Sequence, residues 1–274
     1  MSLHRLATKY VAKPWGRDAL PPLFPDGGGE RIGEVWFEGP EGRHPPLLVK
    51  YIFTSERLSI QVHPTDEQGR ARGLPGGKTE CWYILEAEAD ARLGLGTHQP
   101  LSADQLRTAA LDGSIEHLID WKPVKAGDFF FVPAGTVHAI GAGVTLVEVQ
   151  QNVDVTYRLY DYGRPRELHL DDGVAVSVAA PYRRLSPNLA MIGEADLLDL
   201  REAPFTLNLR SWEAGDTPHI GVEGEQSWFI PLTGSGALNG QRWTAGECWL
   251  LEGPAHLACA QQTKALIATV PAPS

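Results

Sequence analysis

The sequence predicts an all-β protein that folds as two barrels with a few short helices. Three observations lead to this prediction. Most apolar residues fall into short runs that are rich in β-branched and aromatic side chains, and Gly, Pro or Asp bounds each run. Patterns typical of helices are confined to a few short stretches. A related sequence pattern also occurs twice, once in each half of the 274-residue chain.

The strand-like runs account for most of the chain. In the first half they are residues 31–39, 46–53, 58–64, 80–86, 91–96, 128–135 and 144–152. From about residue 185 the chain again has the composition of β-structure, at residues 205–215, 226–240, 247–253 and 264–270.

Helices are expected between the strand-like runs. Ser102 is a predicted N-cap before residues 103–111, and Ser114 is another before residues 115–120. Residues 164–184 read mainly as a connector, with a helix near the centre.

The repeat supports two domains. Residues 79–93 resemble 225–239, and residues 126–140 resemble 245–259. In the second copy Gln226 stands at the position of Glu80 and His256 is displaced by one residue, which turns a strand side chain to the opposite face. We therefore expect a metal-binding domain over residues 1–180 and a smaller, metal-free β domain over residues 181–274 that covers apolar surface of the first.

Composition narrows the classes of function. The formal net charge of −10 argues against binding to nucleic acid or to an anionic membrane, although local cations can still bind a small anion. The N-terminal residues lack the apolar core of a signal peptide, and the three cysteines form no CxxC pair. We expect a cytoplasmic protein that acts on a small molecule, as a monomer or a homodimer.

Residues 127–138, GDFFFVPAGTVH, form the most informative motif. An apolar run leads into a Pro–Gly turn, and His138 follows the turn. Upstream, Gln61 and His63 lie two positions apart on a predicted strand, so both side chains leave the same face. With Glu80 from a further strand, these residues offer two imidazoles, one carboxylate and one amide oxygen. This donor set predicts a site for a borderline divalent metal ion.

These residues resemble those of the cupin superfamily and, more narrowly, those of the short bacterial branch of type I mannose-6-phosphate isomerases. General cupins carry His-x-His, whereas Gln-x-His followed by Lys-x-Glu is particular to this family. The resemblance implies two jelly-roll barrels of the cupin type, the second degenerate. The stretches that carry it are residues 13–16, 33–36, 47–64, 77–84, 129–143 and 148–164.

The resemblance also implies roles for individual side chains. The zinc ligands of the family fall on Gln61, His63, Glu80 and His138. Catalytic positions of the family fall on Arg158, Lys78 and Glu148. Positions that line the substrate pocket in relatives fall on Lys50, Ser59 and Glu34.

The activity implied is the interconversion of D-mannose 6-phosphate and D-fructose 6-phosphate through a cis-enediol intermediate. Such a reaction moves a proton between C1 and C2, and a metal ion can stabilise the charge that develops. Glu148 and Lys78 are both candidates for the base, and the sequence does not decide between them. Arg158 is suited to a bidentate grip on phosphate or on enediolate oxygens.

Two other functions fit the same donor set. One is a non-catalytic cupin that binds a sugar or another metabolite, because Pro14 and Ile140 depart from the pattern of longer relatives. The other is a metal-dependent cupin oxygenase, because this fold also supports iron chemistry.

Overall fold

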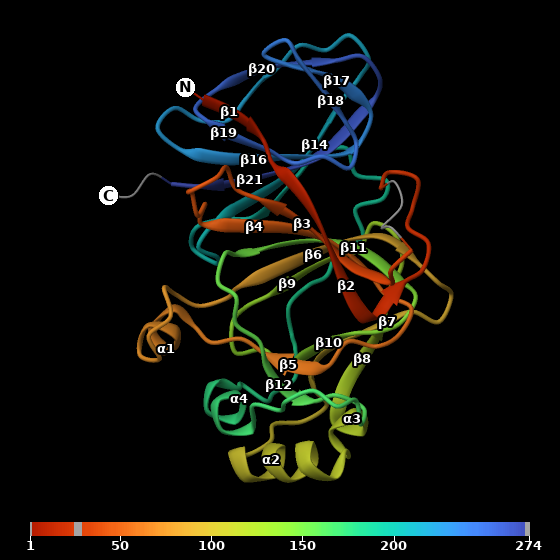
Figure 1. Ribbon diagram of the computed structural model, residues 1–274, viewed down its shortest axis with the longest axis vertical. Helices are drawn as coiled ribbons and strands as arrows, with labels where there is room; N and C mark the ends of the chain where they lie inside the picture. The colour runs from red at the N-terminus through yellow and green to blue at the C-terminus, as the bar shows by residue number, and fades with distance from the viewer. Residues whose placement is uncertain (1, 25–28, 272–274) are drawn as a thin grey trace.

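The computed structural model describes residues 2–24 and 29–271, and β-strands are its main secondary structure. Four sheets are stacked face to face along the long axis of the molecule (Figure 1). The two lower sheets form the first barrel and the two upper sheets form the second. The expectation of a mostly β fold with a few short helices is confirmed.

The first barrel is formed by strands from the N-terminal part of the chain. Its inner sheet, which faces the second barrel, has the order β2 (Ala7–Arg17), β3 (Ile32–Glu38), β4 (Leu47–Phe53), β11 (Val144–Gln151), β6 (Glu80–Ala87) and β9 (Phe129–Val132). Its outer sheet has the order β12 (Tyr157–Tyr160), β5 (Ile60–Val62), β10 (His138–Ile140), β7 (Arg92–Thr97) and β8 (Ile119–Pro123).

The second barrel is formed mainly by the C-terminal part. Its inner sheet has the order β1 (Ser2–Arg5), β19 (Trp249–Glu252), β16 (Gln226–Thr233), β21 (Thr263–Val270), β14 (Thr206–Trp212) and β13 (Ala195–Leu198). Its outer sheet has the order β15 (His219–Ile220), β20 (Ala255–Cys259), β17 (Ser235–Leu238) and β18 (Gln241–Thr244). The N-terminal strand β1 therefore pairs with a C-terminal sheet, and the division near residue 180 stays a prediction.

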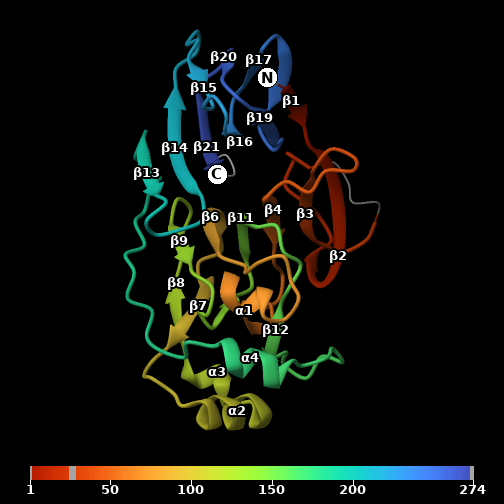
Figure 2. The same cartoon turned by 90° about the vertical axis from the view of Figure 1, so that its left-hand side faces the viewer.

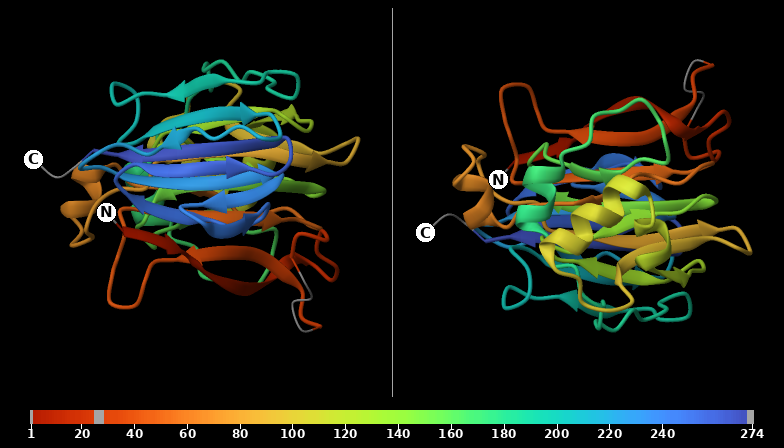
Figure 3. Two further views of the ribbon diagram at one scale, coloured as in Figure 1. Left: turned by 90° about the horizontal axis from the view of Figure 1, so that it is seen from above. Right: turned by 90° about the horizontal axis from the view of Figure 1, so that it is seen from below.

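The structure contains the helices α1 (Asp66–Arg70), α2 (Ala103–Asp112), α3 (Ile115–Leu118) and α4 (Leu170–Val176). Three of the helices, α2, α3 and α4, lie at the free end of the first barrel, whereas α1 lies at its side (Figures 2 and 3). Ser102 caps α2 as predicted, in a reciprocal capping box with Gln105. The apolar face of α2 packs on the outer sheet, where Leu106 joins a cluster with Ile60 and Val62.

Alternation along the strands assigns each side chain of the inner sheet to one of two compartments. On β6, Cys81 and Tyr83 point toward the second barrel, whereas Trp82 and Ile84 point into the first. The largest core cluster contains residues from the inner sheets of both barrels, including Tyr83 of β6 and Trp228 of β16. The second barrel thus covers an apolar sheet that would otherwise face water.

None of the helices in the described part of the chain has the length and apolar character needed to cross a membrane.

Candidate metal centre and substrate pocket

Cross-strand pairing brings the polar residues of the first barrel together. In the inner sheet, Glu148 of β11 lies between Lys50 of β4 and Trp82 of β6. In the outer sheet, Gln61 of β5 lies between His138 of β10 and Arg158 of β12. Partners in adjacent strands have their side chains on the same face. The two sheets therefore each present a polar row to the barrel interior.

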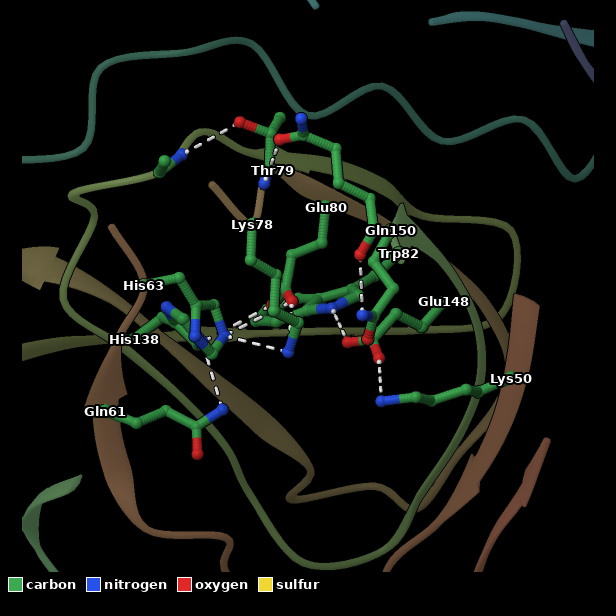
Figure 4. Close-up of polar contacts among 12 residues, drawn as sticks. Lys50, Gln61, His63, Lys78, Thr79, Glu80, Trp82, His138, Glu148 and Gln150 are labelled. Carbon is green, nitrogen blue, oxygen red and sulfur yellow. Dashed lines mark hydrogen bonds and ion pairs between the residues drawn. The ribbon is translucent and has the colours of Figure 1, made fainter. Parts of the chain in front are cut away.

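His63, Glu80 and His138 form a compact buried group, called here the metal cluster (Figure 4). His63 Nε2 lies 3.3 Å from Glu80 Oε2, and His138 Nε2 lies 3.3 Å from Glu80 Oε1. All three side chains are 1% exposed. Ligands about 2.0–2.1 Å from a tetrahedral zinc ion are about 3.3 Å apart, so these contacts match the edges of such a site.

Glu80 carries the clearest sign that the cluster suits a cation. Within the described residues neither carboxylate oxygen has a hydrogen-bond partner, both oxygens are buried, and the nearest ammonium group, Lys78 Nζ, lies 3.1 Å from Oε2. Burial alone would raise the pKa of Glu80, but the charge of Lys78 and the contacts with His63 hold that pKa well below its usual range. A buried carboxylate without hydrogen bonds is costly unless a cation balances it. The donor set therefore fits a divalent metal ion.

The two histidines are held in the state that binds metals. Burial first, and then the charge of Lys78, lowers the pKa of His63 to about 3. Burial also lowers the pKa of His138. The ring of His138 is oriented by a 2.8 Å contact between Nδ1 and the carbonyl oxygen of Thr136. When Nδ1 carries the proton and donates to that carbonyl, Nε2 presents its lone pair to the cluster.

Gln61 borders the metal cluster through its amide group. Its Nε2 lies 3.3 Å from Nε2 of His138, and its Oε1 accepts a hydrogen bond of 3.0 Å from Ser59. A half-turn of the amide would exchange the two atoms and direct Oε1 toward His138. Gln61 can thus offer either a donor or an acceptor at this position.

A pocket opens beside the metal cluster, and its wall carries an excess of positive charge. Cationic side chains in the wall are Lys13, Lys50, Lys78, Arg158 and Arg166. The carboxylates in the wall are Glu34 and Glu148, and Ser59, Gln61 and Thr156 are polar neighbours. This local excess lies in a chain with a net charge of −10, so the pocket is suited to an anionic ligand.

Glu148 and Lys50 form the central ion pair of the pocket. Lys50 Nζ lies 3.2 Å from Glu148 Oε2, and Trp82 Nε1 donates a 3.0 Å hydrogen bond to Glu148 Oε1. Burial and the nearby charge of Glu80 raise the pKa of Glu148, although Lys50 acts in the opposite direction. Burial would lower the pKa of Lys50, but Glu148 and Glu34 raise it overall. Lys50 is therefore held in its charged form.

Glu34 forms a second buried group beside this pair. Its Oε2 accepts a 2.5 Å hydrogen bond from Trp36 Nε1, and its Oε1 lies 3.6 Å from Lys13 Nζ. Burial would raise the pKa of Glu34, but Lys50 and Lys13 lower it overall. The ammonium group of Lys50 lies 4.7 Å from the ring centroid of Trp36, a favourable cation–π geometry. These contacts link Glu34 to the Lys50 side of the pocket.

Comparison with known proteins agrees with this geometry. Over 248 residues the chain is 32% identical to the probable mannose-6-phosphate isomerase GmuF of Bacillus subtilis (strain 168), an alignment that covers 83% of this chain and 77% of the relative. The chain belongs to the mannose-6-phosphate isomerase family. It is also 43% identical over 161 residues to mannose-6-phosphate isomerase ManA of the same organism. That alignment covers 54% of this chain and 51% of ManA.

The relatives differ in how much of their own length this chain matches. The chain aligns with only about half the length of ManA and of the mannose-6-phosphate isomerase of Streptococcus mutans serotype c, to which it is 38% identical over 166 residues. No family model matches the chain.

Solved structures extend the family likeness to the whole fold. The mannose 6-phosphate isomerase from Bacillus subtilis superposes with a TM-score of 0.75 at 27% identity, over 98% of this chain and 99% of that chain. A putative mannosephosphate isomerase from Archaeoglobus fulgidus superposes with a TM-score of 0.74 at 17% identity, over 99% and 98% of the two chains. The second likeness concerns the fold alone.

The predicted site residues of this isomerase-family chain all lie at the metal cluster or in the adjoining pocket. The structure brings His63, Glu80 and His138 to one point. Seven other predicted residues line the adjoining pocket, namely Glu34, Lys50, Ser59, Gln61, Lys78, Glu148 and Arg158. Their individual roles in binding and catalysis stay predictions.

Three polar residues of the pocket were missed by the sequence reasoning: Lys13, Thr156 and Arg166. Lys13 opens the family-like stretch at residues 13–16, which was a usable signal. Thr156 lies two residues before Arg158, immediately before β12, and both residues line the pocket. Arg166 lies in a loop beyond the last family-like stretch, and no spacing in the sequence placed it at the pocket.

Proposed function

We propose that the protein is a metal-dependent aldose–ketose isomerase that interconverts D-mannose 6-phosphate and D-fructose 6-phosphate. The observation that carries the proposal is a buried His–Glu–His cluster beside a pocket with an excess of cationic side chains. The substrate requires both features, because it has a carbonyl carbon to activate and a phosphate dianion to bind. Membership of the mannose-6-phosphate isomerase family supports this choice of substrate.

Gln61, His63, Glu80 and His138 are the proposed metal ligands, and zinc is the proposed metal. Two imidazoles with one carboxylate are typical of catalytic zinc sites, and an amide oxygen from Gln61 would complete the set. A bound ion would supply Lewis-acid stabilisation of negative charge on the C1 and C2 oxygens of the substrate.

Glu148 is the proposed base that moves the proton between C1 and C2. It lies in the pocket wall, and burial and Glu80 raise its pKa toward the range in which a carboxylate is an effective base. Trp82 and Lys50 each contact one of its oxygens and thereby fix its orientation. Lys78, whose Nζ lies 3.1 Å from Glu80 Oε2, remains the alternative base.

The remaining pocket residues are proposed to bind and orient the sugar phosphate. Arg158 forms no ion pair in the part of the chain that the structure describes; its Nη1 donates a 3.3 Å hydrogen bond to the carbonyl oxygen of Glu167, and its positive charge is available to an anionic substrate. Lys50, Ser59 and Glu34 offer donors and acceptors for hydroxyl groups along the sugar.

We also propose that the protein acts in the reducing cytoplasm. All three cysteines are buried and free of disulfide bonds.

The test is a coupled assay for fructose 6-phosphate with mannose 6-phosphate as substrate. The purified protein should turn over when loaded with zinc and should lose activity after treatment with a chelator. Glu148→Gln should reduce kcat by on the order of 10²–10⁴, whereas Glu116→Gln, on a helix outside the pocket, should leave it unchanged. Absence of turnover by a folded protein that holds its metal would refute the proposal.

A further inference from the structure

Two arginines share the wall of the pocket but come from different places. Arg158 lies on β12 opposite Gln61, so its side chain starts next to the metal cluster. Arg166 comes from the loop between β12 and α4. Both side chains line the same pocket. Like charges that converge on one pocket indicate a site for a multivalent anion.

Asp161 holds Arg166 in a fixed orientation. Arg166 Nε donates a 2.6 Å hydrogen bond to Asp161 Oδ2, and Nη2 donates a 2.7 Å bond to Oδ1. The carboxylate of Asp161 is almost completely buried, which makes this bidentate contact strong. Within the described residues, no hydrogen bond is formed by Nη1 of Arg166, so this edge of the guanidinium group remains available to a ligand.

Asp161 does not cancel the positive charge of this region. Arg164 Nη2 also lies 3.3 Å from Asp161 Oδ1. One carboxylate therefore faces two arginines of the loop, and an excess of positive charge remains there. This excess favours an anionic group of the ligand beside Arg166.

The shape of the substrate separates the tasks of the two pocket arginines. The reacting carbons C1 and C2 stand at one end of the six-carbon chain, and the phosphate is attached to C6 at the other end. A side chain next to the metal cluster is therefore poorly placed to hold the phosphate while the metal ion holds the reacting end. This reasoning favours the loop arginine for the phosphate and Arg158 for the enediolate end.

We propose that Arg166 binds the phosphate group of the substrate and that Asp161 is the residue that positions it. This inference rests on the proposed function, because it names the part of the same pocket that recognises the phosphate. Arg166 then determines specificity for phosphorylated over free sugars.

The test compares Arg166→Gln with Arg164→Gln in the zinc-loaded full-length protein. Arg164 is the matched control because it belongs to the same loop and contacts Asp161 but does not line the pocket. Loss of one charged hydrogen bond should raise KM for mannose 6-phosphate about 10- to 100-fold in Arg166→Gln, with kcat changed less than about 3-fold. Arg164→Gln should stay within about 3-fold of the native protein. An equal rise in KM for both variants, or none for Arg166→Gln, would overturn the inference.

Two further variants separate positioning from charge. Arg166→Lys keeps the charge but loses the bidentate contact, so it should recover part of the affinity. Asp161→Asn keeps acceptor capacity but loses charge, and it should raise KM less than Arg166→Gln does. A KM for Asp161→Asn equal to that of the native protein would remove Asp161 from the proposal.

Inorganic phosphate distinguishes this inference from the proposed function. Calorimetric titration should show that phosphate binds the native protein and binds Arg166→Gln at least about 10-fold more weakly. If phosphate binds the native protein more tightly than Arg166→Gln but the native protein has no isomerase activity, the proposed function is wrong and the phosphate site stands. If the protein is an active isomerase and phosphate binds both forms equally, the phosphate site falls and the function stands.

Discussion

Replacing Lys50 by Met tests whether the ion pair at the centre of the pocket is as buried as the structure indicates. The change removes the ammonium group but keeps most of the side chain's volume. Glu148 Oε2 then loses its 3.2 Å partner, while Trp82 still donates to Oε1. The side chains of Lys50 and Glu148 are only 9% and 5% exposed, so water of the pocket replaces the lost partner only in part.

The expected cost follows from this burial. Removing one partner of a buried ion pair costs about 3–5 kcal/mol, because the remaining charge is left without compensation. Lys50 also neighbours Glu34 and lies over the ring of Trp36, and both contacts are lost together. Protonation of Glu148 limits the cost, since each pKa unit corresponds to about 1.4 kcal/mol. We expect a loss of about 3 kcal/mol in the free energy of unfolding at pH 8.

The loss should depend on pH in one direction. The pKa of Glu148 is raised in the folded protein, so its contribution to stability is fully present below the unfolded-state pKa and disappears as the pH rises through the folded-state pKa. Lys50 lowers that folded-state pKa, and Lys50→Met should therefore raise it further. The variant should be closer to the native protein in stability at pH 5 than at pH 8.

Urea unfolding followed by tryptophan fluorescence measures both effects. The double variant Lys50→Met with Glu148→Gln is the control, because the amide introduced at position 148 carries no charge and can still accept the hydrogen bond from Trp82. It should regain more than half of the lost stability. A loss below about 1 kcal/mol at pH 8, or a double variant no more stable than the single one, would show that the pair is solvated and would refute the reasoning.

Three further predictions concern the metal cluster, a helix cap and a glycine turn. Glu80→Gln should abolish tight zinc binding in equilibrium dialysis while circular dichroism shows a folded protein, and native-like zinc affinity would exclude Glu80 as a ligand. Ser102→Ala removes the side chain that accepts from the backbone N–H of Gln105, which should cost about 1 kcal/mol in urea unfolding without changing kcat, and an unchanged midpoint would contradict this role. Gly127 has φ of 86°, and an added Cβ would lie 2.6 Å from the backbone nitrogen of Ala190. Gly127→Ala should therefore lower the free energy of unfolding by about 1–3 kcal/mol in urea unfolding. A smaller loss would mean that the turn adapts to the added side chain.

Local patterns in the sequence account for much of the fold. The strand-like runs at residues 46–53, 80–86 and 144–152 correspond to β4, β6 and β11, because β-branched and aromatic side chains at these positions pack on a pleated surface. Ser102 marked the start of α2 because a capping box is encoded within four residues.

Long-range pairing was harder to predict. Residues 2–5 form β1 only because Trp249–Glu252, near the other end of the chain, offers them an open edge. The helix α1 at residues 66–70 was missed, since five residues are too few for a helical period. The pattern of a strand also cannot state which strand will lie beside it.

For the site, the sequence by itself determined which donor types are present and which side chains share a face. Gln-x-His puts two ligand candidates on one side of a strand. An apolar run is followed by a turn, and His138 comes directly after that turn. Such information is local, because alternation and turn chemistry act over a few residues.

Only the tertiary structure decided what these groups meet. Register sets Lys50 beside Glu148 and Arg158 beside Gln61, and burial then shifts the pKa of Glu148 upward and that of His63 downward. The loop that carries Arg166 to the pocket is held by the carboxylate of Asp161 in the same loop. No periodicity in the sequence predicts this contact. Electrostatic effects depend on distances in space and on the exclusion of water, and both arise only when separate segments pack together.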